Sequence, residues 1–276
     1  MFPILRTLRR IVRPALAAAA LAVPLAGYGA CSRDIRVPVA PTGFSVIVSG
    51  SSVSGAFPDM LRELGQKMGC KFVFPVVPRA RLSFMFLNSG EADLLLPASR
   101  SAERDKQAIF VSMMTLKMAL ISLKQREIKT SSVKELLAGR RLQGIVVRSY
   151  VFGDEYNALI QGLDAQNRVF YANSLETVAR MLQAGRGDFT LIAPSIFLSA
   201  LSENPELETM RGKLDFNVLD GLPPAESGVY ISKRSLSAVD QAELYALLET
   251  ARKGVFLKSF KKYYPADMLQ FVVLPH

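Results

Sequence analysis

The stretch GEADLLLPASRSAERDKQAIF (Gly90–Phe110) decides how the fold of this chain is interpreted. Five apolar or small residues in succession, Leu94–Ala98, predict a buried strand. The strand runs directly into two serines and two arginines, at positions 99, 101, 100 and 104. Hydroxyl and guanidinium groups stand at the end of this buried strand in place of a simple polar turn, which makes the strand end a candidate for a functional role.

Strands and helices alternate on both sides of this stretch. Before it, strands are expected at 44–50 and 70–77 and helices at 59–69 and 78–93. After it, a second β-α-β-α-β set is expected over 118–194, with a last strand near 227–235 and helices at 237–254 and 255–265. The two sets echo each other in NSGEADLLL (88–96) and QAGRGDFTL (183–191). Alternation of this kind predicts parallel strands with helices on the sheet faces.

The first thirty residues have the order of a secretory signal. Four arginines precede an apolar run from about Ala15 to Ala26, and small residues follow. We therefore expect 1–30 to be a signal peptide and the protein to be exported to the periplasm. Without those arginines, 30 of the 34 basic residues remain against 24 acidic ones, a net charge of +6. That mild excess, with no run of like charges, argues against nucleic acid as a partner.

Two cysteines, Cys31 and Cys70, remain after the signal. In an oxidising compartment an even pair suggests a disulfide. The alternative is a lipid anchor on Cys31, because YGAC (28–31) loosely resembles a lipobox. Both interpretations stay open from the sequence alone.

The order of these motifs resembles a known family. Pro78–Val111 is similar to the G-x-x-D…T-x-x-x-R…F segment of the periplasmic solute-binding proteins of polar amino-acid ABC transporters (extracellular solute-binding protein family 3). Ser132–Ser149 resembles that family's entry into its second lobe, and Ser174–Ala193 its later helix–strand unit. The resemblance implies an α/β fold of type 2: two lobes, each a mainly parallel sheet flanked by helices, joined by two crossing hinge strands. Lobe 1 is then expected at 36–122 plus 226–276 and lobe 2 at 123–225, with hinges near 120–123 and 229–231.

The resemblance also implies where a ligand binds. The family's arginine that grips the ligand carboxylate falls on Arg104, and its upstream hydroxyl contact falls on Ser99. In the second lobe, the matching hydroxyl and N–H contacts fall on Ser149 and Tyr150. The alternatives are that Arg104 forms a surface ion pair with Glu103 or Asp105 and that Ser149 only caps a helix.

Four further residues lie near predicted strand ends and are candidates for the site. Arg79 and Arg81 would add positive charge to the cleft, and Phe57 and Tyr230, together with Tyr150, could form its walls. For the two arginines the alternative is a solvated helix start, and for the aromatics it is core packing.

The chain departs from the family at one place. The family commonly has an aspartate after the strand that follows G-x-x-D, where it pairs with an α-ammonium group. That place is Ala193 here. The ligand is therefore expected to be a carboxylate or other anion, unless another acid such as Glu226 or Asp59 meets an ammonium group.

Enzymatic chemistry has little support in the sequence. The single histidine is His276, the last residue, which argues against a Ser-His-Asp triad and a histidine metal site. No Walker loop, G-x-S-x-G or G-x-G-x-x-G motif is present. We expect a monomeric, non-enzymatic binding protein without a cofactor or metal, with a small ligand and a membrane permease as partners. The alternatives are a ligand-sensing or partner-binding module of the same fold and a dehydratase-like enzyme.

Overall fold

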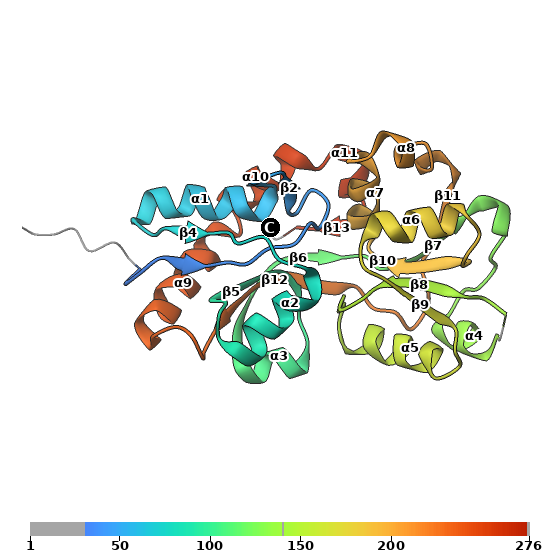
Figure 1. Cartoon of the computed structure of the whole chain (residues 1–276), viewed down its shortest axis with the longest axis horizontal. Coiled ribbons are helices and arrows are strands. Elements are labelled where there is room, and N and C mark those ends of the chain that lie inside the picture. Colours follow the sequence, from blue (N-terminus) through green and yellow to red (C-terminus); the bar gives the residue numbers. More distant parts are fainter. Residues whose placement is uncertain (1–30, 140, 275–276) are drawn as a thin grey trace, which may run out of the picture.

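Two β-sheets organise the chain in the computed structural model, which describes residues 31–139 and 141–274 (Figure 1). One sheet has four strands in the order β13-β6-β12-β5, and the other has five in the order β11-β7-β10-β8-β9. Figure 1 shows them in opposite halves of the molecule, each covered by its own helices. This is the two-lobed α/β arrangement that the family resemblance implies. The expected signal peptide, 1–30, lies outside the described residues.

The first lobe is built from the two ends of the chain. Its four-stranded sheet is accompanied by a parallel pair, β1-β4, and a hairpin, β2-β3. Its strands are β1 (Ile35–Arg36), β2 (Ile47–Ser49), β3 (Ser52–Ser54), β4 (Phe72–Val73), β5 (Leu94–Ser99), β6 (Ala108–Leu116), β12 (Ala225–Ser232) and β13 (Val272–Val273). Its helices are α1 (Ala56–Met68), α2 (Arg79–Phe84) with a π-helical extension η1 (Met85–Ser89), α3 (Ala102–Gln107), α9 (Ala238–Ala251), α10 (Val255–Tyr263) and α11 (Ala266–Leu269).

The second lobe is formed by the middle of the chain. Its strands are β7 (Ala119–Leu123), β8 (Gly144–Val147), β9 (Val169–Ala172), β10 (Phe189–Ile192) and β11 (Leu214–Asn217). Its helices are α4 (Val133–Ala138), α5 (Asp154–Asp164), α6 (Leu175–Gln183), α7 (Pro194–Ser202) and α8 (Pro205–Glu208), with the 3-10 turns η2 (Lys124–Arg126) and η3 (Arg211–Lys213). A serine side chain caps the N-termini of α3, α4, α6 and α9 by accepting a backbone hydrogen bond, which satisfies one of the free N–H groups there.

The sheets are mixed, and the expectation of mainly parallel sheets is wrong in this respect. β12 pairs antiparallel with both β5 and β6, and β13 pairs antiparallel with β6. In the second lobe β8 pairs parallel with β9 and β10, but β7 pairs antiparallel with β10 and β11. The strand that enters each lobe at a crossing, β12 in the first lobe and β7 in the second, runs against its neighbours in the sheet.

The crossings between the lobes lie beside each other, since β6 and β12 pair from Leu116↔Ala225 onward. The chain leaves the first sheet after Leu116 and enters the second at Ala119, and it returns between Asn217 and Ala225. We therefore propose lobe boundaries at 117–118 and 218–224. The expected boundary at 122/123 would separate β7 from the sheet in which it pairs, and the expected hinges at 120–123 and 229–231 lie inside β7 and β12.

The echo between the two halves of the sequence has a structural cause. Gly90 and Gly185 each have a positive φ, 69° and 68°, which ends the preceding helix in the left-handed region. Three residues later the aspartate of each motif accepts a backbone N–H from a neighbouring segment. Asp93 accepts from Arg36 at 2.8 Å, and Asp188 accepts from Gln143 at 2.7 Å. The G-x-x-D pattern thus anchors an adjacent strand in each lobe.

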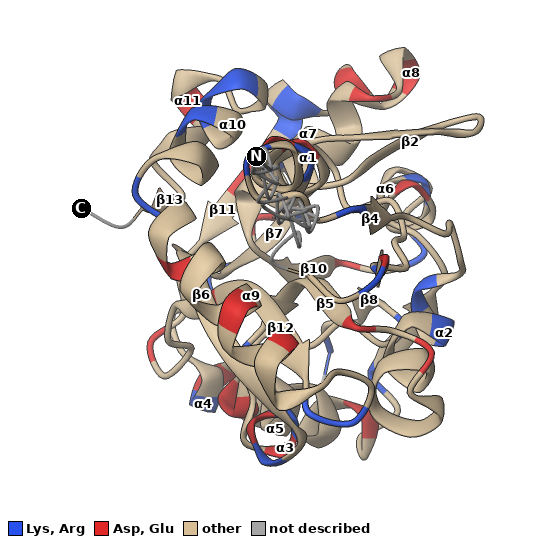
Figure 2. Ribbon diagram, turned by 90° about the vertical axis from the view of Figure 1, so that its left-hand side faces the viewer, with Lys and Arg blue, Asp and Glu red and all other residues tan. Residues whose placement is uncertain are grey.

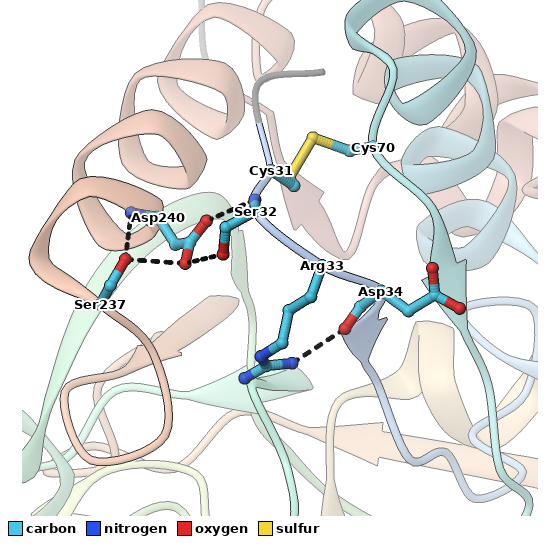
Figure 3. Close-up of a disulfide and its surroundings, with 7 residues drawn as sticks. All are labelled: Cys31, Ser32, Arg33, Asp34, Cys70, Ser237 and Asp240. Atoms are coloured by element: carbon cyan, nitrogen blue, oxygen red, sulfur yellow. Dashed lines mark hydrogen bonds between the residues drawn. A yellow bond between two sulfur atoms is a disulfide. The ribbon is translucent and has the colours of Figure 1, made fainter. Parts of the chain in front are cut away.

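A disulfide joins Cys31 to Cys70 and fastens the start of the described chain to the segment just after α1 (Figure 3). The next residue is held as well, because Ser32 donates two hydrogen bonds to Asp240, from its backbone N–H at 2.9 Å and its hydroxyl at 2.7 Å. Asp240 is in the first turn of α9. The N-terminal segment is therefore attached to both α1 and α9. A disulfide-bonded sulfur cannot also carry a lipid.

Replacing both Cys31 and Cys70 with serine is expected to lower the free energy of unfolding by about 3–4 kcal/mol. The disulfide closes a loop with a sequence separation of 39 residues, and opening it increases the chain entropy of the unfolded state. Urea unfolding followed by circular dichroism measures the change. Wild type under reducing conditions should lose as much stability as the double variant, whereas an unchanged midpoint would contradict the structural role of the bond.

Charge is spread over the surface in both signs. Figure 2 shows acidic and basic segments interspersed, with basic residues on α10 and acidic ones on α8 and α9. This arrangement differs from the single basic face of a nucleic-acid-binding protein. Among the described residues, no helix combines the length and the apolar character needed to cross a bilayer.

Candidate ligand-binding site

A cavity of about 410 Å³ lies where the two lobes meet, and we call it the chamber. One wall comes from the first lobe, from residues 40, 41, 43, 48 and 77–79. The opposite wall comes from the second lobe, from residues 147, 150, 173–176, 200, 203 and 204. Its volume falls in the range of small-molecule sites, which commonly occur between domains.

A much smaller cavity, of about 20 Å³, lies nearby and shares two residues with the chamber, Arg79 and Tyr150. Its walls include Ser99 at the end of β5 and Thr42 in the loop after β1. The lobes are therefore in close contact at this point. Arg79 and Tyr150 form the boundary between this small cavity and the chamber.

Arg79 is the first residue of α2, directly after Pro78, and its side chain is half-buried. The guanidinium lies 4.9 Å from the ring centroid of Tyr150, which comes from the other lobe. Its polar contacts are long ones, to the Thr42 hydroxyl at 3.5 Å and the carbonyl of Pro97 at 3.3 Å. It forms no ion pair with any residue that the structure describes. Burial lowers the pKa of Arg79, an effect that Tyr150 partly offsets.

Arg104 is in α3, and only 5% of its surface is exposed. Its guanidinium donates to the carbonyl of Ser99 at 2.9 Å, but no described carboxylate pairs with it. The alternative of a surface ion pair therefore does not hold, since Asp105 pairs instead with Arg100 at 2.9 Å. Burial, followed by the positive charge of Arg79, lowers the pKa of Arg104 to about 10. Two uncompensated guanidinium groups thus influence each other near the interlobe contact.

Three of the predicted site residues are brought together at the cavities: Arg79, Ser99 and Tyr150. Arg104 lies against the backbone of Ser99. Ser149 has a positive φ of 66° in the turn after β8 but lines neither cavity. It does not cap a helix either, because α5 begins only at Asp154, after Gly153.

The other three predicted residues are placed elsewhere. Arg81 is exposed and lies 3.9 Å from Glu91, away from the chamber walls. Phe57 is fully buried and packs on Phe256, with ring centroids 5.1 Å apart, so it belongs to the core and not to a ligand wall. In the sequence, an apolar residue beside a predicted strand end looks the same whether it packs in the core or lines a ligand site.

Tyr230 is also fully buried and does not line either cavity. Its hydroxyl donates to Asp105 at 2.7 Å and accepts the backbone N–H of Ser101 at 3.0 Å. Both partners are at the start of α3, which carries Arg104. Tyr230 is therefore a positioning residue for that helix.

The sequence interpretation missed several residues of the second-lobe wall, above all Asn173 and Glu203. Glu203 follows α7 in the polar turn SENPE (202–206), which resembles an ordinary surface loop. The two acids suggested instead are engaged elsewhere. Asp59 accepts from Lys262 at 2.8 Å and from Tyr263 at 2.5 Å, and Glu226 lies 3.4 Å from Arg100.

The site offers hydrogen-bond donors and charged groups, which can bind a polar or charged small molecule. Within 31–139 and 141–274, no group of histidine, cysteine and acidic side chains is arranged to hold a metal ion.

Comparison with known proteins identifies the fold of the chain. No family model matches the sequence, and no curated protein is significantly similar to it. The structure is similar to a histidine kinase sensor domain with similarity to periplasmic binding proteins, with a TM-score of 0.68, 18% identity and coverage of 88% of this chain and 98% of that one.

Two transport-related structures are also similar. One is a putative L-cystine ABC transporter protein from Listeria monocytogenes, with a TM-score of 0.67, 19% identity and coverage of 85% and 97%. The other is an amino acid ABC transporter substrate-binding protein from Streptococcus pneumoniae bound to L-arginine, with a TM-score of 0.65, 16% identity and coverage of 83% and 93%. The chain therefore has the two-lobed fold of the periplasmic binding proteins.

Proposed function

We propose that the protein is an exported solute-binding protein that captures a small, carboxylate-bearing ligand between its lobes. The observation that carries the proposal is the pair of arginines at the interlobe contact, Arg79 and Arg104, neither of which has a carboxylate partner among the described residues. Arg104 is buried and Arg79 is half-buried, and a charge withdrawn from water without a partner is costly, so a site that keeps both charges is suited to an anion. A guanidinium matches a carboxylate with two parallel hydrogen bonds.

Arg79 is proposed as the direct ligand contact, because it lines both cavities. Arg104 supports it with positive charge and holds the carbonyl of Ser99. Tyr150 contributes from the second lobe. A ligand that contacts groups of both lobes favours the closed arrangement, since only that arrangement makes all the contacts. The similarity to solute-binding proteins supports binding without catalysis, with delivery to a membrane permease from the periplasm.

A thermal-shift screen of residues 31–276 tests the proposal. The panel contains amino acids, dicarboxylates, aromatic acids and small amines. A ligand that binds only the folded state raises the melting temperature in a concentration-dependent way. We expect every hit to carry a carboxylate. Hits confined to amines, or none at all, would contradict the proposed anion site.

A ligand-sensing role is the second candidate, because a histidine kinase sensor domain has the same fold over nearly its whole length. Both roles use the same cleft and differ in the partner. Uptake of a radiolabelled hit that depends on this protein would support transport. Unchanged uptake, together with a hit-dependent complex with a membrane kinase, would support sensing.

A further inference from the structure

The lobes touch at the edge of the chamber, where a loop of the first lobe meets helix α7 of the second. Gly43 in this loop has a positive φ of 52° and lies against Ser199 of α7. A Cβ atom added to Gly43 would overlap the hydroxyl group of Ser199 and lie 3.1 Å from the carbonyl oxygen of Ile196. Gly43 and Ala200 both line the chamber, on opposite walls. Separating the chamber walls would therefore break this contact.

The contact is closed to solvent and supported from behind. Ser45 of the loop and Ser199 of α7 are both 0% exposed. The hydroxyl of Ser45 shares a hydrogen bond of 2.8 Å with the hydroxyl of Tyr264, and the ring of Tyr264 stacks on Phe260 with centroids 4.0 Å apart. The loop is thus fixed to its own lobe, and opening the lobes would lose close packing and hydrate buried surface.

The C-terminal segment, α11 and β13, makes a second set of contacts between the lobes. Asp267 of α11 forms an ion pair with Arg211 of η3. Phe271 packs on Phe216 of β11, with ring centroids 5.5 Å apart, and α11 lies against α7 (Figure 1). The carbonyl of Phe271 also accepts the backbone N–H of Lys117, in the first crossing, at 3.0 Å. A segment of the first lobe therefore contacts the second lobe beside the crossing.

We propose that these two sets of contacts, which we call the clasp, hold the lobes closed when no ligand is bound. The clasp is the Gly43 loop against α7 together with the α11–β13 segment against η3 and β11. Its contacts between the lobes use neither arginine of the proposed anion site. A lobe arrangement that is already closed spares the ligand an unfavourable closing step, which would otherwise weaken its apparent affinity. The inference rests on the proposed function for what the chamber binds, but not for the closed state itself.

Small-angle X-ray scattering of residues 31–276, without any ligand, tests the closed state directly. We expect the profile extrapolated to zero concentration to match the profile calculated from this structure, because the clasp needs no ligand. A profile with a larger radius of gyration, which fits only separated lobes, would overturn the proposal.

The variant Ser199→Leu tests the contact with Gly43. Leucine is a good helix former, but its branched end has no room against Gly43, so the lobes should separate and the radius of gyration should rise. Ser199→Ala is the matched control. It removes only a hydroxyl that donates to the carbonyl of Ile196 in the same helix, at 2.9 Å, and it should stay as compact as wild type.

Hydrogen exchange separates opening of the lobes from unfolding. In Ser199→Leu the backbone amides of 42–45 should exchange about tenfold faster than in wild type, whereas those of β5 and β10 should keep the wild-type rates. Those two strands lie in the sheets of the two lobes and report whether each lobe is still folded. Wild-type compactness and exchange in Ser199→Leu would overturn the role of this contact.

The variant Asp267→Lys tests the second half of the clasp at an exposed position, where folding is not at risk. The Asp267 side chain is 58% exposed, and lysine would place a like charge beside Arg211. Exchange of the amides of 266–274 should become about threefold faster. Gln270→Lys is the control, because it adds a positive charge to the same segment without removing a partner of Arg211. Equal rates in Asp267→Lys and wild type, or equal increases in both variants, would remove the ion pair from the clasp.

The outcomes distinguish this inference from the proposed function, since none of these measurements uses a ligand. Separated lobes in the ligand-free wild type would overturn the clasp and leave the anion site standing. Closed lobes in a protein that gives no hit in the thermal-shift screen would support the clasp and contradict the anion site.

Discussion

Replacing Arg79 with methionine is expected to weaken binding of every carboxylate hit by about a hundredfold or more. Arg79 lines both cavities and has no carboxylate partner among the described residues, so a ligand carboxylate would supply its first ion pair. Hydrogen bonds between charged groups in a desolvated site contribute about 1.5–3 kcal/mol each, and loss of one buried charge partner costs about 2–5 kcal/mol. Titration calorimetry with the best hit of the screen measures the loss.

The matched control is Arg81→Met, two residues away on the same helix. Arg81 is exposed and lies outside both cavities. The Kd of the Arg81→Met variant for the same ligand should therefore stay within about twofold of wild type. The melting temperature of Arg79→Met without ligand should not fall, because the positive charge of Arg79 opposes that of Arg104. Equal losses of affinity in both variants would show a general effect of positive charge, and an unchanged Kd in Arg79→Met would remove Arg79 from the site.

Replacing Asp93 with asparagine is expected to lower the free energy of unfolding by about 2–4 kcal/mol. The Asp93 carboxylate is fully buried and accepts from the guanidinium groups of Arg33, at 2.7 and 2.8 Å, and Arg36, at 2.9 and 3.1 Å. It also accepts the backbone N–H of Arg36. Asparagine keeps one acceptor and loses the charge. The control is Asp34→Asn, an exposed partner of Lys71 for which we expect at most about 1 kcal/mol.

The Asp93 carboxylate also makes the free energy of unfolding depend on pH. Burial raises the pKa of Asp93, but the hydrogen bonds from Arg33 and Arg36 outweigh it and hold the pKa well below its usual range. The stabilisation is therefore complete above the unfolded-state pKa, about 3.9, and is lost as the pH falls further. Urea midpoints from about pH 6 to about pH 2.5 should fall less steeply in Asp93→Asn than in wild type. Parallel curves would contradict the proposed role of the carboxylate.

The sequence could predict the alternation of strands and helices because its local signals agree with one another, and the family resemblance implied the two lobes. Leu94–Ala98 is apolar and becomes buried β5, and the two G-x-x-D motifs mark equivalent points in the two lobes. Strand direction at the crossings could not be predicted in the same way. β7 and β12 are apolar strands like the others, and their antiparallel pairing depends on which neighbours the chain brings together.

The candidate site was only partly predictable. Arg79 could be found because its charge stands at a predicted strand end, but its lack of a partner depends on the three-dimensional structure. Phe57 has the same local character as a wall residue, and only packing on Phe256 shows that it belongs to the core. Glu203 lies in a polar turn without a motif. Only the three-dimensional structure shows that this turn lines the chamber.

The most direct test of the central claim, that ligand binds in the interlobe chamber, is fluorescence from a single introduced tryptophan. The chain has none. Val48→Trp places the reporter on the chamber wall without removing a polar contact, and Phe170→Trp places it on exposed β9, away from the chamber. Titration with the best hit should change the emission of Val48→Trp with the Kd found by calorimetry, and leave Phe170→Trp unchanged. Binding at that Kd with a response only from Phe170→Trp, or from neither reporter, would contradict the account.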